Sequence, residues 1–237
     1  MTISKARVGD LIRQLEKPFV LNPIARVDHF AVYLYLCQGF VARHRHALQD
    51  ELFYVCSGLM RVETGWGKET LLPDECVVIP RGLVHMTGSS VATFALNIQA
   101  TGEPERKNGH GRLMGEAASG TLIKGTYHNL GHELRDPYHA VHLAQADEMS
   151  LRAVMCEGIT PWHQHAQHDE LLWLREGTLE IELREDSLLL DHDELAVIPR
   201  NTAHRLAAQE RAVAISLIDG RVAPHTHMGL MGDTGLD

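Results

Sequence analysis

The sequence predicts an all-β protein of two similar β-barrels or sandwiches in tandem, on the strength of three observations. The chain matches itself at a single offset of 119 residues, without a gap between residues 25 and 98. Within each copy, short apolar segments alternate with closely spaced turn signals, which is typical of sandwiches and barrels. Helical periodicity is convincing in one short N-terminal segment only. A chain of 237 residues is long enough for two such units.

The first element that the sequence predicts is a short N-terminal helix. Val8, Leu11, Ile12 and Leu15 follow the i, i+3, i+4, i+7 spacing of one helix face, and Pro18 ends the segment. Because one face of this helix is apolar, we expect it to pack on a barrel or on a partner subunit.

The next elements are strands that occur twice. Residues 51–57 (ELFYVCS) and 170–176 (ELLWLRE) are short apolar segments, each followed by a glycine, and residues 75–80 and 194–199 end in a proline that stops a strand. Between residues 50–85 and 169–204, 13 of 36 positions are identical. A fixed offset with this identity indicates an internal duplication.

The duplication predicts the domain organisation. The two unit cores lie at about residues 25–98 and 144–217. Seven glycines fall between them, and a segment of this length is too long for a plain loop. We therefore expect residues 121–128 and 139–144 to form the first strands of the second unit. The predicted divisions are an N-terminal barrel at 1–100, a connecting segment at 101–143, and a C-terminal barrel with a tail at 144–237.

Composition excludes several classes of protein. The net charge of −9 argues against nucleic-acid binding, which depends on cationic contacts with phosphate. The longest strongly apolar run, residues 31–37, is far shorter than the roughly 20 residues of a membrane helix. The N-terminus lacks the apolar core of a signal peptide, and the four cysteines form no CxxC pair. We therefore expect a cytoplasmic protein with reduced thiols and with neither nucleic-acid nor membrane partners.

The histidines predict metal sites, since histidine is the commonest metal ligand and the chain has 16 of them. His44 and His46 would share one face of a strand, a short turn would bring Glu51 beside them, and His85 follows the strand that ends at Pro80. Three imidazoles and one carboxylate suit Fe(II), Mn(II), Ni(II), Cu(II) or Zn(II). The second copy repeats the set as His163, His165, Glu170 and His204. The alternatives are that these are ordinary polar strand residues, or that one of the two sites is vestigial.

At these residues the sequence resembles the cupin superfamily. GFVARHRHALQDELFYVCSG and GITPWHQHAQHDELLWLREG are similar to the first cupin motif, and DECVVIPRGLVH and DELAVIPRNTAH to the second. The resemblance covers roughly 150 residues and is nearest to mannose-6-phosphate-isomerase-like cupins in tandem. It implies a bicupin of two jelly-roll barrels, each holding one divalent metal by three histidines and a glutamate. Asp74 and Asp193 replace a motif glycine, and Asn201 replaces another, although asparagine tolerates the same left-handed turn.

The resemblance also implies a function. We expect an enzyme acting on a small organic acid or enol, nominally a dioxygenase, with Fe, Mn, Zn or Ni in each barrel. The alternatives are a metal-dependent isomerase or decarboxylase and a non-catalytic small-ligand-binding cupin, because fold does not determine function. Cupin barrels commonly pair through sheet edges, so a homodimer is expected.

The sequence also predicts the surroundings of several residues near the two metal sites. Phe53 and Leu172 lie two residues past the glutamates, so each should face an apolar barrel interior. His168 is expected to be a solvent-facing loop residue, with a role next to the metal as the alternative. Arg81 and Arg200 are expected to form ion pairs with Asp74 and Asp193 or with Glu75 and Glu194, and binding of a substrate carboxylate is the alternative.

Overall fold

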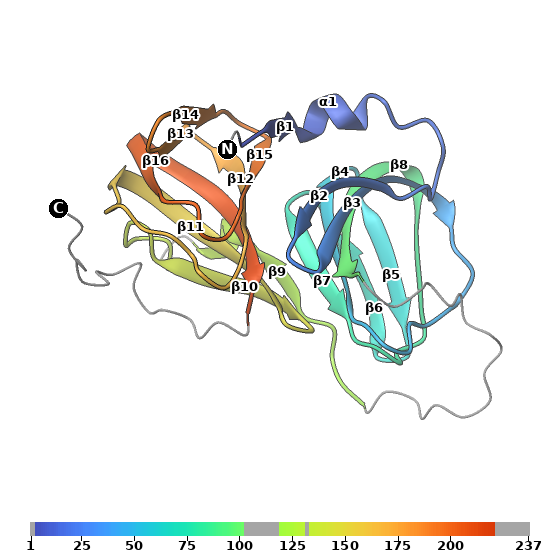
Figure 1. The fold of residues 1–237 in the computed structure, drawn as a ribbon. Helices are drawn as coiled ribbons and strands as arrows, with labels where there is room; N and C mark the ends of the chain where they lie inside the picture. Colours follow the sequence, from blue (N-terminus) through green and yellow to red (C-terminus); the bar gives the residue numbers. More distant parts are fainter. Residues whose placement is uncertain (1–2, 102–118, 131–132, 221–237) are drawn as a thin grey trace.

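The computed structural model describes residues 3–101, 119–130 and 133–220. It is an all-β protein with two eight-stranded sheets, and each sheet curls into a barrel beside the other (Figure 1). The all-β prediction and the prediction of two tandem barrels are therefore confirmed. Among the described residues, no helix is long and apolar enough to cross a membrane.

Each barrel takes its strands mainly from one copy of the repeat. The N-terminal sheet has the order β2-β3-β8-β4-β7-β9, with β5 and β6 as a hairpin on β8. Its strands are β2 (Asn22–Val27), β3 (Phe30–Phe40), β4 (Glu51–Ser57), β5 (Met60–Thr64), β6 (Gly67–Leu71), β7 (Glu75–Ile79), β8 (His85–Ala100) and β9 (Lys124–Thr126).

The C-terminal sheet repeats this plan. Its order is β1-β15-β12-β16-β11-β10, with β13 and β14 as the hairpin on β16. Its strands are β1 (Lys5–Arg7), β10 (Ala140–Ala146), β11 (Met149–Ile159), β12 (Glu170–Glu176), β13 (Leu179–Leu183), β14 (Ser187–Leu190), β15 (Glu194–Ile198) and β16 (His204–Asp219).

The two barrels exchange one edge strand each. β1 precedes the N-terminal barrel in the chain but pairs with β15 of the C-terminal sheet, with Lys5 opposite Ala196. β9 pairs with β7 of the N-terminal sheet, with Lys124 opposite Val77. The 119-residue offset relates β1 to β9 and β15 to β7, so the exchange is reciprocal and the duplication extends to residue 5.

This exchange corrects one sequence prediction. Residues 121–128 were expected to form a first strand of the second unit, but only Lys124–Thr126 is a strand, and it belongs to the N-terminal sheet. The other expected strand, residues 139–144, is found as β10, which pairs with β11. A short apolar segment predicts an extended chain but carries no signal for the sheet that accepts it.

The N-terminal helix begins where the apolar pattern predicts and ends earlier. α1 spans Val8–Ile12, followed by a looser turn in which the Leu15 N–H donates to the Ile12 carbonyl at 3.1 Å. Its apolar side packs on the hydrophobic core between the barrels, which confirms the expected contact with a barrel. A short 3₁₀ helix, η1 (Tyr127–Leu130), occupies the equivalent place after β9.

Strand alternation divides the apolar side chains among three cores. On β4, Leu52 and Tyr54 face a core between the barrels, whereas Phe53 and Val55 face the interior of the N-terminal barrel. Leu172 of β12 lies in the corresponding interior core of the C-terminal barrel. Phe53 and Leu172 are thus buried inside the barrels, as predicted.

A buried ionic cluster crosses the core between the barrels. Arg175 of β12 places Nη2 at 2.8 Å from Asp74 Oδ1 of the N-terminal half and Nη1 at 2.8 Å from Asp193 Oδ1 of its own half. Its guanidinium lies over the Trp173 ring, 4.3 Å from the ring centroid. Both aspartates have positive φ, which allows them to stand where the cupin motif has glycine.

Candidate metal centres

The N-terminal cluster is assembled from a loop and the first residues of two strands. His44 lies in the loop after β3 and forms an isolated antiparallel bridge with His85, the first residue of β8. His46 follows in the same loop, and Glu51 begins β4. The prediction of a regular strand through His44 and His46 is wrong, because outside that single bridge the loop belongs to no ladder.

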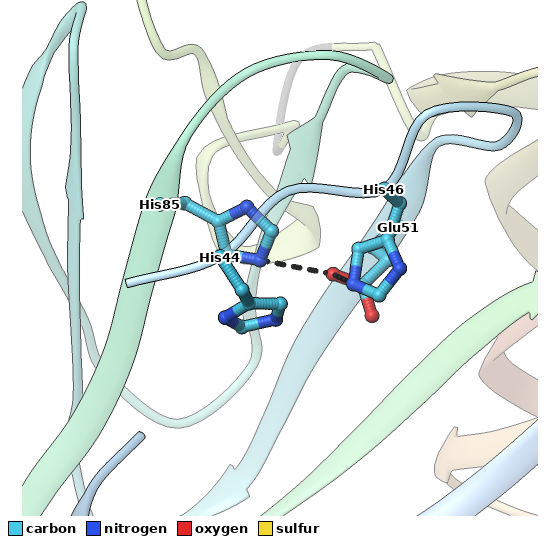
Figure 2. A group of neighbouring side chains, drawn as sticks. All are labelled: His44, His46, Glu51 and His85. Atoms are coloured by element: carbon cyan, nitrogen blue, oxygen red, sulfur yellow. Dashed lines mark ion pairs between the residues drawn. The ribbon is translucent and has the colours of Figure 1, made fainter. Parts of the chain in front are cut away.

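The four side chains point toward one another (Figure 2). Glu51 Oε2 lies 3.0 Å from His46 Nε2 and 3.1 Å from His85 Nε2. His44, His46, Glu51 and His85 each offer one potential ligand atom, and these four atoms all lie within 4.8 Å of one another. The structure therefore brings together the whole predicted N-terminal set.

The C-terminal cluster brings three of its four residues together in the same way. Ligand atoms of His163, His165 and His204 lie within 4.8 Å of one another. Glu170 is adjacent, with Oε2 at 3.2 Å from His165 Nε2, but it is outside that group of three. His163 and His204 are bridged by backbone hydrogen bonds of 2.9 Å in both directions, as their counterparts are.

The histidine tautomers are set by backbone carbonyls. A carbonyl accepts only, so each of the following Nδ1 atoms donates: His44 to Ala42, His85 to Leu83, His163 to Pro161 and His204 to Thr202, at 2.8–3.0 Å. Nε2 then carries the lone pair. In His85, His163 and His204 this atom is buried without a hydrogen-bond partner among the described residues. Orphaned lone pairs that converge in this manner fit a metal cation.

The electrostatics favour neutral imidazoles and ionised carboxylates. Burial lowers the pKa of His44 and His163, and it lowers the pKa of His204 to about 4. Burial by itself raises the pKa of Glu51 and Glu170, but the neighbouring histidines, and for Glu170 also Arg152, outweigh it, so both pKa values are lowered. At neutral pH His44, His163 and His204 are therefore neutral and the two glutamates ionised, as metal binding requires.

The outer oxygen of each glutamate has a partner that sequence reasoning missed. Glu51 Oε1 accepts from Asn97 Nδ2 at 3.0 Å, and Glu170 Oε1 accepts from Ser216 Oγ at 2.9 Å. Asn97 and Ser216 are equivalent at the 119-residue offset but differ in type, so the search for repeated identities did not show them. Arg152 was missed for the same reason: its guanidinium Nη2 lies 3.8 Å from Glu170 Oε1, and burial lowers its pKa.

Two further expectations are corrected. His168 does not face solvent: it is 6% exposed, and its ring stacks on His165 with centroids 4.6 Å apart. Arg81 and Arg200 do not pair with the predicted carboxylates. The Arg81 side chain is 3.9 Å from Asp147, and that of Arg200 is 3.7 Å from Asp28.

The C-terminal barrel matches a known protein family. Residues 154–218 match the model of the Cupin domain family (Cupin_2). A curated relative, the uncharacterized protein YdbB of Bacillus subtilis, is 25% identical over 85 residues, which is 35% of this chain and 75% of that protein.

Solved structures match both barrels. A Cupin 2 conserved barrel domain protein from Leptotrichia buccalis superposes with a TM-score of 0.69 over 92% of this chain and 97% of its own, at 12% identity. Salicylate 1,2-dioxygenase from Pseudaminobacter salicylatoxidans gives 0.70 over 93% and 85%, at 10% identity. A variant of oxalate decarboxylase from Bacillus subtilis gives 0.55 over 92% and 78%, at 13% identity.

At sequence identities of 10–13%, the similarity to these structures is a similarity of fold alone. It extends over both barrels, and it agrees with the family match in the C-terminal half and with the 119-residue register that relates the two halves. The C-terminal barrel matches the Cupin domain family, and the chain as a whole is similar in fold to the cupin structure from Leptotrichia buccalis.

Proposed function

We propose that this protein is a metal-dependent enzyme that acts on a small organic acid or enol, nominally as a dioxygenase, with one divalent metal in each barrel. The observation that carries the proposal is the convergence of histidine ring nitrogens and a glutamate oxygen in each barrel, among them the buried Nε2 atoms of His85, His163 and His204. Glu51 and Glu170 are 6% and 1% exposed, so each carboxylate is an expensive group to bury without a cation.

The residues of the chain have definite parts in this proposal. His44, His46, Glu51 and His85 would hold one metal, and His163, His165, Glu170 and His204 the other. A metal bound there by three histidines and a carboxylate would supply a Lewis acid with coordination positions left for a substrate or O₂. Phe53 and Leu172 lie in the apolar interior cores of the two barrels.

The same donor set would serve decarboxylation or isomerisation of a small acid. The fold is shared with a dioxygenase and with a decarboxylase, so fold does not separate these reactions. Measurement of O₂ consumption separates a dioxygenase from a decarboxylase or an isomerase. We propose oxygen chemistry first because a histidine and carboxylate set with open coordination positions would suit a ferrous ion that activates O₂.

The first test is elemental analysis of the purified protein and of variants. The expected content is two equivalents of metal per chain. His46→Ala and His165→Ala should each lower it to about one, because the two clusters share no ligand. His142→Ala, a change at an exposed histidine of β10 outside both clusters, is the matched control and should leave the content unchanged.

The second test is O₂ uptake with a panel of small hydroxy acids, diketones and enols. A dioxygenase consumes O₂ in step with substrate, and the His46→Ala and His165→Ala variants show which barrel carries the activity. Release of CO₂ without O₂ uptake would replace the dioxygenase assignment by decarboxylation. Protein that neither contains metal nor takes it up on reconstitution would contradict the proposed function.

A further inference from the structure

We propose that Arg152 makes the C-terminal site the weaker of the two metal sites, because its guanidinium lies beside Glu170 and competes with a metal for that carboxylate. The inference rests on the proposed function, since it takes both clusters to be sites for a divalent metal. It concerns a difference between two sites that the duplication would otherwise make equivalent.

The N-terminal carboxylate is directed at its histidines. Asn97 Nδ2 donates to Glu51 Oε1 at 3.0 Å and turns the other oxygen inward. That inward oxygen, Oε2, lies 3.0 Å from His46 Nε2 and 3.1 Å from His85 Nε2. A neutral amide thus positions the carboxylate and leaves its full negative charge facing the imidazoles.

The C-terminal carboxylate has a competing cation. Ser216 Oγ donates to Glu170 Oε1 at 2.9 Å, and the Arg152 guanidinium lies 3.8 Å from the same oxygen. Arg152 is itself held there, because its Nη2 donates to Ser216 Oγ at 3.0 Å. Glu170 Oε2 is 3.2 Å from His165 only, and Glu170 falls outside the compact group of three histidines.

The residues that differ around the two glutamates occupy equivalent positions in the two barrels. Arg152 stands opposite Ser216 in the β11–β16 pairing, as Tyr33 stands opposite Asn97 in the β3–β8 pairing. The offset of 119 residues relates both pairs. The C-terminal barrel therefore has a cation where the N-terminal barrel has a neutral phenol.

A buried cation next to a metal ligand weakens metal binding in two ways. It repels the divalent ion directly, and it withdraws charge from the carboxylate that would bind the ion. The Arg152 side chain is 19% exposed and that of Glu170 is 1% exposed, so water screens the interaction poorly. We therefore expect the C-terminal site to bind a divalent metal at least tenfold more weakly than the N-terminal site.

The experiment isolates each site in the full-length protein. His163→Ala/His165→Ala leaves the N-terminal site, and His44→Ala/His46→Ala leaves the C-terminal site. Co²⁺ affinity is measured for each metal-free variant by competition with a chromophoric chelator. The expected result is a dissociation constant at least tenfold larger for the variant that retains only the C-terminal site.

Arg152 is then tested in the variant that retains only the C-terminal site. Arg152→Met, which removes the charge and keeps the length, should tighten Co²⁺ binding at least fivefold. Arg152→Lys, which keeps the charge, should leave the binding weak, whereas a purely structural role would make both variants change alike. A thermal melt and a circular dichroism spectrum identify a variant that fails to fold. If the Arg152 variants fail to fold, the comparison of Co²⁺ affinity between the two isolated sites remains the test.

The outcomes separate this inference from the proposed function. Equal Co²⁺ affinities in the two isolated sites, or an Arg152→Met variant that folds and binds no more tightly, would overturn the role of Arg152 while leaving two metal sites. Absence of Co²⁺ binding in both isolated sites would overturn the proposed function and the inference with it.

Discussion

Asp50 and Asp147 exchange a pair of hydrogen bonds across the boundary between the two barrels. The Asp50 N–H donates to Asp147 Oδ2 at 2.9 Å, and the Asp147 N–H donates to Asp50 Oδ2 at 2.8 Å. Asp28 and Asp169, their counterparts at the 119-residue offset, do the same at 3.1 and 3.0 Å. Because Asp50 and Asp169 directly precede Glu51 and Glu170, each barrel holds in place the loop next to the glutamate of the other barrel's histidine cluster.

The first prediction concerns this fastening. Asp147→Ala leaves the Asp50 N–H without its acceptor, so we expect a loss of about 1–3 kcal/mol in the free energy of unfolding. We also expect weaker metal binding at the N-terminal site, although Asp147 is in the C-terminal half. Burial raises the pKa of Asp147, so Asp147→Asn, which keeps an acceptor oxygen and removes the buried charge, should behave nearly as wild type. Chemical denaturation and metal titration measure the two effects, and an Ala variant as stable as the Asn variant would contradict the prediction.

The second prediction concerns the ionic cluster between the barrels. Arg175→Leu leaves Asp74 and Asp193 as partly buried carboxylates without their shared cation. We expect a loss of about 3 kcal/mol or more in the free energy of unfolding, since an uncompensated buried charge is costly. Arg211→Leu removes an exposed ion pair with Glu176 and is the matched control, with an expected loss below about 1 kcal/mol. Equal losses in urea denaturation would show that the cluster contributes little.

The third prediction tests the exchanged strand β9. A Cβ at Gly125 would lie 2.5 Å from the Leu143 carbonyl oxygen and 2.9 Å from Cys76 Sγ, so the backbone must shift. We expect Gly125→Ala to cost about 1–3 kcal/mol through overpacking of β9 against β7 and β10. At Gly65 the nearest atom to a Cβ is Leu83 Cδ1 at 3.8 Å, and Gly65→Ala should be close to neutral. The midpoints of thermal unfolding compare the two variants; a harmless Gly125→Ala would mean that β9 packs loosely.

The fourth prediction is a pH dependence of the metal-free protein. Burial lowers the pKa of His204 to about 4, whereas in the unfolded chain it is about 6.5. Between these values the unfolded chain binds more protons, so stability is complete above about pH 6.5 and falls as the pH drops toward 4. The loss from this group is at most on the order of 3 kcal/mol.

Urea denaturation of the metal-free protein at several pH values between 7 and 4.5 measures this slope. The pKa of His163 is also lowered, which adds a contribution of the same sign, whereas the lowered pKa values of Glu51 and Glu170 place their contributions below this window. Stability that stays constant from pH 7 to 5 would contradict the buried neutral state of His204. Saturation with metal should reduce the slope, because bound metal keeps the histidines unprotonated until a lower pH.

Much of the site could be predicted from local sequence because its parts occur twice. Repetition of His44, His46, Glu51 and His85 at one offset made the residue set conspicuous, and the structure brings these four together. Positions that differ between the two copies carry no such signal. Residues that differ between the copies, such as Arg152 and His168, carried no repeat signal although both lie beside the C-terminal cluster.

Residue type and spacing were enough to predict two barrels, the burial of Phe53 and Leu172, and the residues of the two histidine clusters. These are properties of chemical type and spacing, which a chain carries locally. The folded chain was needed to show that β1 and β9 change places, that Arg81 and Arg200 lie near Asp147 and Asp28, and that Arg152 lies beside Glu170. Strand pairing, ion pairing and burial depend on which distant segments meet, and that choice is made by the packing of the whole chain.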